Sequence, residues 1–123
     1  MTLRILYVDD EADLREIAQI SLELDAELEV RCCASGEEAL AQLPIWHPDL
    51  VLLDVMMPEM DGPTTLQRIR EIEAGRELPV VFITARAGQG DTDRLMQLGA
   101  AGVIGKPFDP MALAAQVRAY LPG

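Results

Sequence analysis

Four apolar runs of the sequence lead to polar residues that could take part in chemistry. These residues are Asp9, Asp10, Asp54, Thr84 and Lys106. If the runs are parallel strands of one sheet, their carboxyl ends meet at one edge and the five side chains share one crevice. Three carboxylates there would repel each other and raise the pKa of at least one of them. A divalent cation removes this repulsion, and oxygen ligands suit Mg²⁺, which keeps room for water and a phosphate oxygen.

The same residue types fit the transfer of a phosphoryl group, which needs a nucleophile, a metal ion and positive or donor groups on the phosphoryl oxygens. Asp54 can be the nucleophile, because carboxylates form acyl phosphates. Lys106 supplies a compact positive charge, and the hydroxyl of Thr84 supplies a hydrogen-bond donor. Each residue alone has an ordinary explanation as a cap, a turn residue or a solvated side chain. Their joint placement at four strand ends favours phosphoryl transfer.

The elements that position these residues follow from the spacing of the apolar residues. Strands are expected over residues 3–8, 28–32, 50–53, 80–83 and 103–104. Helices are expected over residues 11–24, 35–43, 62–72, 91–98 and 109–121. In the first helix the apolar side chains expected to face the core are Leu14, Ile17, Ala18 and Leu24.

Local signals set the ends of several helices. Ser35 and Glu38 form a capping box at the start of the second helix, and Pro44 is expected to end that helix. Asp91 is expected to cap the fourth helix, and Asp109 followed by a proline predicts the start of the fifth. Each helix is therefore short and connects one strand to the next.

Strands that alternate with helices, without an internal linker, predict one α/β domain with a doubly wound parallel sheet and helices on both faces. Four of the strands are continuously apolar, as parallel strands buried on both faces are. Segment 28–32 alternates instead, so we expect it at an edge of the sheet. The strand order 2-1-3-4-5 fits this pattern and places the crevice between the first and third strands, where the order reverses.

The composition narrows the range of partners. The chain has 123 residues, enough for one domain with its own core, and a net charge of −11. We expect no nucleic-acid or membrane partner, because phosphate binding needs clustered Lys and Arg, whereas basic protein surfaces and cations are favoured. The adjacent residues Cys32 and Cys33 have neither metal-binding nor disulfide spacing, which is typical of a reduced, cytoplasmic protein. The sequence has no signal-peptide pattern and no apolar run of membrane-spanning length.

Four strings in the sequence are similar to those of one protein family. They are YVDD at 7–10, LLDVMMPEMDG at 52–62, VVFITA at 80–85 and GKPF at 105–108. In this order they resemble the receiver domain of two-component response regulators, over essentially the whole chain. The resemblance implies a flavodoxin-like (βα)5 fold and a phosphorylation-dependent signalling switch that is not a turnover enzyme. It also implies two partners: a histidine kinase or histidine phosphotransfer protein, and an output protein that binds the surface of the fourth helix, fifth strand and fifth helix.

The resemblance implies a metal site at the matching positions. Asp10 and Asp54 would bind Mg²⁺ directly, and Asp9 would act mainly through water. The backbone carbonyl of Met56 would be a further ligand.

The resemblance also implies how the phosphoryl group is held. Asp54 would be the phosphoacceptor, and Lys106 would contact Asp54 at rest and the phosphoryl group afterwards. Thr84 would move toward the phosphoryl group on activation. The bond between Lys106 and Pro107 would be cis, which is uncommon enough to be a specific feature.

One departure from the family pattern and two positions at which the family varies lead to further expectations. Val103 stands where the family usually has Tyr or Phe, so we expect the switch to run through Thr84 and the loop 88–90 instead. Met56 and Arg86 stand where the family varies beside the route of the hydrolytic water, and neither can orient that water as a base. We therefore expect slow self-dephosphorylation.

The chain begins at Met1 and ends one helix after Lys106, so we expect a stand-alone receiver domain over residues 1–123. A piece of a longer regulator would have the same pattern. One alternative is a binding-only pseudo-receiver, but such proteins lose an Asp, Thr or Lys that is present here. The other is a Mg²⁺-dependent phosphohydrolase with an Asp nucleophile, which needs a second Asp at the position that Met56 occupies.

Overall fold

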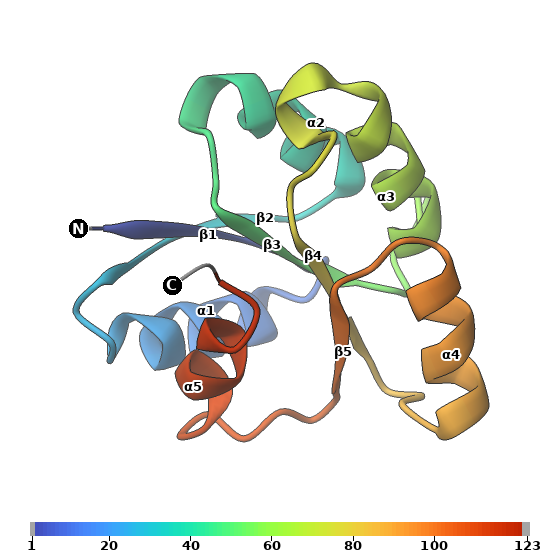
Figure 1. Cartoon of the computed structure of the whole chain (residues 1–123). Coiled ribbons are helices and arrows are strands. Elements are labelled where there is room, and N and C mark those ends of the chain that lie inside the picture. Colours follow the sequence, from blue (N-terminus) through green and yellow to red (C-terminus); the bar gives the residue numbers. More distant parts are fainter. Residues whose placement is uncertain (1, 122–123) are drawn as a thin grey trace.

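The computed structural model describes residues 2–121, in which strands and helices alternate along the chain (Figure 1). The strands are β1 (Leu3–Val8), β2 (Leu28–Cys33), β3 (Leu50–Asp54), β4 (Val80–Thr84) and β5 (Gly102–Gly105). The α-helices are α1 (Ala12–Glu23), α2 (Gly36–Trp46), α3 (Gly62–Glu71), α4 (Gln89–Gln97) and α5 (Leu113–Arg118), with a 3-10 turn at Glu73–Gly75. The expected alternation of strand and helix is confirmed.

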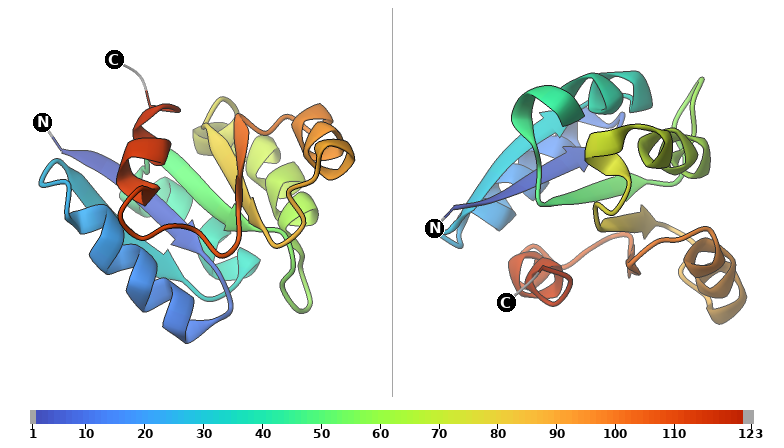
Figure 2. Two further views of the ribbon diagram at one scale, coloured as in Figure 1. Left: turned by 90° about the horizontal axis from the view of Figure 1, so that it is seen from below. Right: turned by 45° about the horizontal axis from the view of Figure 1, so that its top comes forward.

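The five strands form one parallel sheet in the order β2-β1-β3-β4-β5, as the sequence predicts. Alternate residues of each strand supply two separate cores. Leu6 and Val8 of β1 pack on the side of α2 and α3, whereas Ile5 and Tyr7 pack on the side of α1 and α5. Figures 1 and 2 show these two helix pairs on opposite faces, with α4 beside the β5 edge.

The two edge strands differ in part from expectation. β2 is an edge strand and its burial alternates, as predicted. β5 is the other edge, so its burial also alternates, and Val103 is half-buried rather than covered on both faces. A continuous apolar run is therefore no proof of burial on both faces when the run is only a few residues long.

The expected core face of α1 is wrong in two positions. Ile17 and Leu24 are exposed, whereas Ala18, Ser21 and Leu22 are buried. The buried face of α1 is therefore the stripe 18, 21 and 22, and position 17 lies on the solvent side of it.

The Ser35 cap is confirmed, with Glu38 reaching one residue further back than a standard capping box does, but the end of α2 is not where Pro44 predicts. The hydroxyl of Ser35 accepts a hydrogen bond from the N–H of Glu38 (3.1 Å), and the Glu38 carboxylate accepts one from the N–H of Ala34 (3.3 Å). The helix continues through Pro44 to Trp46. A proline in the last turn removes one hydrogen bond, and the helix tolerates that loss where it is about to end anyway.

The remaining predicted caps also need correction. The N-cap residue of α4 is Gly88, and Asp91 lies in the first turn of the helix instead. The Asp109 carboxylate accepts a hydrogen bond from the N–H of Met111 (2.9 Å), which caps a turn just before α5. Helix α5 itself begins only at Leu113.

Candidate functional site

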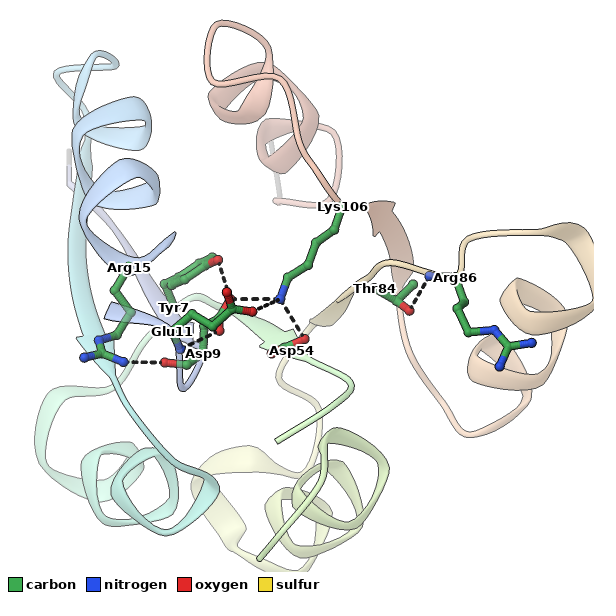
Figure 3. A network of polar contacts seen from close by, with 8 residues as sticks. All are labelled: Tyr7, Asp9, Glu11, Arg15, Asp54, Thr84, Arg86 and Lys106. Atoms are coloured by element: carbon green, nitrogen blue, oxygen red, sulfur yellow. Dashed lines mark hydrogen bonds and ion pairs between the residues drawn. The ribbon is translucent and has the colours of Figure 1, made fainter. Parts of the chain in front are cut away.

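The sequence-predicted polar residues lie at the carboxyl ends of adjacent strands. Asp9 directly follows β1, Asp54 ends β3, Thr84 ends β4 and Lys106 follows β5. The parallel register brings these ends level, because Asp54 pairs with Ile83 and Thr84 pairs with Gly105. Figure 3 shows the side chains of Asp9, Asp54 and Lys106 pointing toward one another.

The carboxylates of Asp9, Asp10 and Asp54 form what we call the acidic cluster. One oxygen from each lies within 4.8 Å of the others. Asp9 and Asp54 are buried, whereas Asp10 is exposed and opens the cluster to solvent. The Nζ atom of Lys106 lies 3.1 Å from Asp54 Oδ1 and 3.2 Å from Asp9 Oδ2, with Glu11 Oε1 at 3.7 Å. A single positive charge, that of Lys106, therefore faces several carboxylates, so negative charge is in excess.

Burial, together with this excess of negative charge, raises the pKa of Asp54. Burial raises that pKa, and the charge of Asp9 raises it further; Lys106 and the backbone amide of Met56 act in the opposite direction but do not outweigh them, so the pKa is about 6. Burial by itself would lower the pKa of Lys106, but its hydrogen bonds and attraction to Asp54 and Asp9 raise it overall. Lys106 is therefore firmly protonated at neutral pH, and Asp54 accepts a proton more readily than an ordinary carboxylate does.

Asp9 is held by several donors that the sequence analysis missed. Its Oδ1 accepts a hydrogen bond from the N–H of Glu11 (2.9 Å), and its Oδ2 accepts one from the hydroxyl of Tyr7 (2.9 Å). Arg15 donates from Nη1 to the Asp9 carbonyl oxygen (2.8 Å). Burial and the Asp9 charge raise the pKa of Tyr7, so its hydroxyl is a donor at neutral pH. The period of two along β1 could have found Tyr7, because residues 7 and 9 share one face.

Thr84 and Met56 lie at the rim of the acidic cluster. Thr84 is buried, and its hydroxyl accepts a hydrogen bond from the N–H of Arg86 (3.0 Å), away from the Lys106 contacts (Figure 3). The side chain of Met56 is exposed, whereas its backbone amide faces the Asp54 carboxylate. The bond between Lys106 and Pro107 is cis, as the resemblance implied.

The residues present fit a hard divalent cation. The donors are all carboxylate oxygens, which suit Mg²⁺, and a cation would offset the repulsion that raises the pKa of Asp54. Asp10 and Asp54 have the oxygens best able to bind it directly, because the Asp9 carboxylate already accepts from Glu11, Tyr7 and Lys106.

Comparison with known proteins identifies the family. A family model described as the response regulator receiver domain matches residues 5–118. The chain therefore belongs to the receiver-domain family of response regulators. Receiver domains are phosphoacceptor signalling domains that generally bind Mg²⁺ at an acidic pocket, and the acidic cluster provides such a pocket here. None of the helices within residues 2–121 is long and apolar enough to cross a membrane.

Individual relatives agree with this assignment. The chain is 42% identical over 119 residues to response regulator Rre1 of Synechocystis sp., covering 97% of this chain and 52% of Rre1. It is 42% identical over 120 residues to response regulator PleD of Caulobacter vibrioides, covering 96% of this chain and 26% of PleD. The chain thus spans about half or less of these curated relatives. The structure of the chemotaxis protein CheY4 of Vibrio cholerae matches with a TM-score of 0.90 and 29% identity, over 98% of this chain and all of that chain.

Proposed function

We propose that this chain is a signalling switch in which Asp54 accepts a phosphoryl group from a histidine kinase or histidine phosphotransfer protein. The observation that carries the proposal is the position of Asp54, buried at the centre of the acidic cluster with Lys106 at 3.1 Å. A carboxylate oxygen of Asp54 attacks the phosphorus atom, the bond from phosphorus to the donor breaks, and its electron pair leaves with the donor.

The chain's own residues prepare this reaction. Lys106 has a fixed positive charge that can follow the phosphoryl oxygens once Asp54 is modified, because its Nζ already contacts both buried acids. We assign direct cation binding to Asp10, Asp54 and the Met56 carbonyl, and water-mediated binding to Asp9. When bound, Mg²⁺ supplies positive charge that neutralises the phosphoryl oxygens and the carboxylates.

We propose that modification is transmitted through Thr84 and the segment that follows it. The Thr84 hydroxyl now accepts from the N–H of Arg86, and moving toward a phosphoryl group would break that hydrogen bond. Residues 85–90 are all exposed, so the segment can change with little loss of packing. The half-buried Val103 lacks the aromatic ring that would report such a change. This favours an output through residues 88–90, which are the N-cap and first turn of α4, toward a protein partner at the α4–β5–α5 surface.

We also propose that the phosphoryl group is retained for long periods. Met56 is 78% exposed and has no group that could orient a water molecule. The Arg86 guanidinium is exposed and lies 4.0 Å from Asp91, pointing to α4 rather than to Asp54. Water near Asp54 therefore has no base from either residue.

The test is incubation of the chain with acetyl phosphate and Mg²⁺, followed by mass spectrometry. We expect a single phosphoryl adduct that hydroxylamine removes and that decays slowly after the donor is withdrawn. Asp54→Asn should abolish the adduct, whereas the matched exposed variant Asp13→Asn should keep it. An adduct that survives in Asp54→Asn would place the site elsewhere, and a wild-type chain that never gains one would favour the binding-only alternative.

A further inference from the structure

Tyr7 lies in the core between the sheet and helices α1 and α5, and its hydroxyl group reaches the acidic cluster. Its side chain is fully buried among apolar residues, including Ala18 of α1 and Leu113 of α5. Its hydroxyl lies 2.9 Å from Asp9 Oδ2, at the point where β1 ends (Figure 3).

The donors around Asp9 show what the Tyr7 hydroxyl does there. The N–H of Glu11 donates to Oδ1 and the Tyr7 hydroxyl donates to Oδ2, so each oxygen of the carboxylate has its own donor. Lys106 also contacts Oδ2, at 3.2 Å, and contacts Asp54 at 3.1 Å. Tyr7 and Lys106 therefore contact the same oxygen of Asp9, and Lys106 is shared between Asp9 and Asp54.

We propose that Tyr7 is a positioning residue that acts through Asp9, a role that rests on the function proposed above. Its hydroxyl fixes the orientation in which the Asp9 carboxylate faces a hydrated cation, and it keeps Lys106 shared between Asp9 and Asp54. Without the hydroxyl, the Asp9 carboxylate can rotate, and Lys106 moves closer to Asp9 and away from Asp54. The cation site loses its fixed oxygen, and Asp54 loses part of its positive neighbour.

A matched pair of variants tests this role. Tyr7→Phe removes only the hydroxyl oxygen, and Tyr120→Phe removes the same atom from the other tyrosine of the chain. The Tyr120 ring lies over Gly102, at the amino end of β5, and thus at the opposite end of that strand from Lys106. The two variants therefore lose the same group at opposite ends of the sheet.

The measurement is the dissociation constant of Mg²⁺, obtained by calorimetry without any phosphodonor. We expect Tyr7→Phe to bind Mg²⁺ about tenfold more weakly, the usual size of effect for a residue that orients a metal-binding carboxylate. Tyr120→Phe should bind as the wild type does. In an Asp9→Ala background, Tyr7→Phe should cause no further loss, because the carboxylate that accepts the Tyr7 hydrogen bond is gone.

Several results would overturn the proposal. Equal Mg²⁺ affinity in Tyr7→Phe and wild type would do so, as would an undiminished loss in the Asp9→Ala background. If wild type itself binds Mg²⁺ and gains the Asp54 adduct in either case, only the role of Tyr7 fails; if wild type does neither, the proposed function fails with it. If Tyr7→Phe does not fold, the wild-type chain labelled with 3-fluorotyrosine gives the answer: Mg²⁺ should shift the fluorine resonance of Tyr7 and leave that of Tyr120, and an unmoved Tyr7 resonance contradicts the role.

Discussion

Two groups of charged side chains lie at opposite ends of the sheet, and they differ in burial, in charge balance and in the direction of their pKa shifts. At the carboxyl ends of the strands is the acidic cluster, in which Lys106 serves the buried Asp9 and Asp54. At the amino ends is a second group, the arginine clamp, in which Arg118 at the end of α5 pairs with Asp25 and Glu27 of the turn before β2. Arg118 donates to both oxygens of Asp25, at 2.8 and 3.1 Å.

The pKa shifts of the carboxylates point in opposite directions at the two ends. In the arginine clamp, hydrogen bonds from Arg118 lower the pKa of Asp25, so the charged form is favoured. In the acidic cluster, burial and the charge of Asp9 raise the pKa of Asp54 to about 6, so the charged form is disfavoured. The clamp is arranged to stabilise the fold, whereas the cluster holds a carboxylate that the fold alone would prefer protonated. An arrangement that works against the fold indicates a ligand or a reaction.

The largest change in stability is expected from removing the positive charge of Lys106 beside the acidic cluster. Lys106→Met leaves Asp9 and Asp54 buried without a positive partner, which should lower the free energy of unfolding by about 2–4 kcal/mol at neutral pH. Mg²⁺ should restore much of this loss, because it supplies the missing charge. Urea unfolding with EDTA and with Mg²⁺ measures both values. A loss that Mg²⁺ leaves unchanged would show that Lys106 acts by packing alone.

The next largest change is a gain in stability, expected when Asp54 is replaced by an uncharged residue. The pKa of Asp54 is about 6 in the native state and 3.8 ordinarily, so between these values the native state binds more protons than the unfolded state. The wild-type fold therefore loses stability as the pH rises through this window and gains none above it. Asp54→Asn removes the titration and should be more stable than wild type by about 1–2 kcal/mol at pH near 7.

The pH dependence of this gain is its own control. Urea unfolding in EDTA should show the advantage of Asp54→Asn shrinking as the pH is lowered toward about 4, where wild-type Asp54 is protonated as well. A gain of the same size at both ends of the range would exclude the charge as its cause. Asp13→Asn, at an exposed position of α1, should show no gain at either pH.

The acidic cluster and the sheet were open to prediction from the sequence, because both depend on rules of strand order and strand ends. Asp9, Asp54 and Lys106 follow apolar runs, and parallel topology alone then brings them together. The hydrogen bond from Tyr7 to Asp9 was not predicted, since it depends on the direction of one buried ring. The arginine clamp was not predicted either, because Arg118 and Asp25 lie 93 residues apart and no strand-end rule connects them.

The predictions of one helix end and of one helix face were wrong. Pro44 was expected to end α2, but the helix has only two residues left after it, so one missing hydrogen bond matters little. Ile17 and Leu24 were expected in the core because they are large and apolar. The structure instead buries Ala18, Ser21 and Leu22, so the helix is turned differently about its axis than the apolar residues alone indicate.

A smaller gain in stability is expected from relieving backbone strain, and it should be the same at both ends of the sheet because it does not depend on charge. Glu59, in the loop after β3, has φ of 69°, and His47, at the end of α2 before β3, has φ of 53°. Glycine adopts these angles without a steric cost, so Glu59→Gly and His47→Gly should each stabilise the fold by about 0.5–1 kcal/mol in urea unfolding. Glu59→Gln, which keeps the side chain but not the charge, should give no such gain. A gain in Glu59→Gln equal to that in Glu59→Gly would assign the effect to charge near the acidic cluster.

The smallest effect is expected from the arginine clamp. Arg118→Met breaks the hydrogen bonds to Asp25 and the contact with Glu27, but all three side chains are partly open to water, where freed carboxylates are readily solvated. The melting temperature should therefore fall by less than in Lys106→Met, although both variants replace one cation by methionine. High salt should reduce the difference between Arg118→Met and wild type, because salt screens exposed charges, and phosphoryl uptake by Asp54 should be unchanged. If Arg118→Met were the more damaging of the two, burial and charge excess could not be what distinguishes the two ends of the sheet.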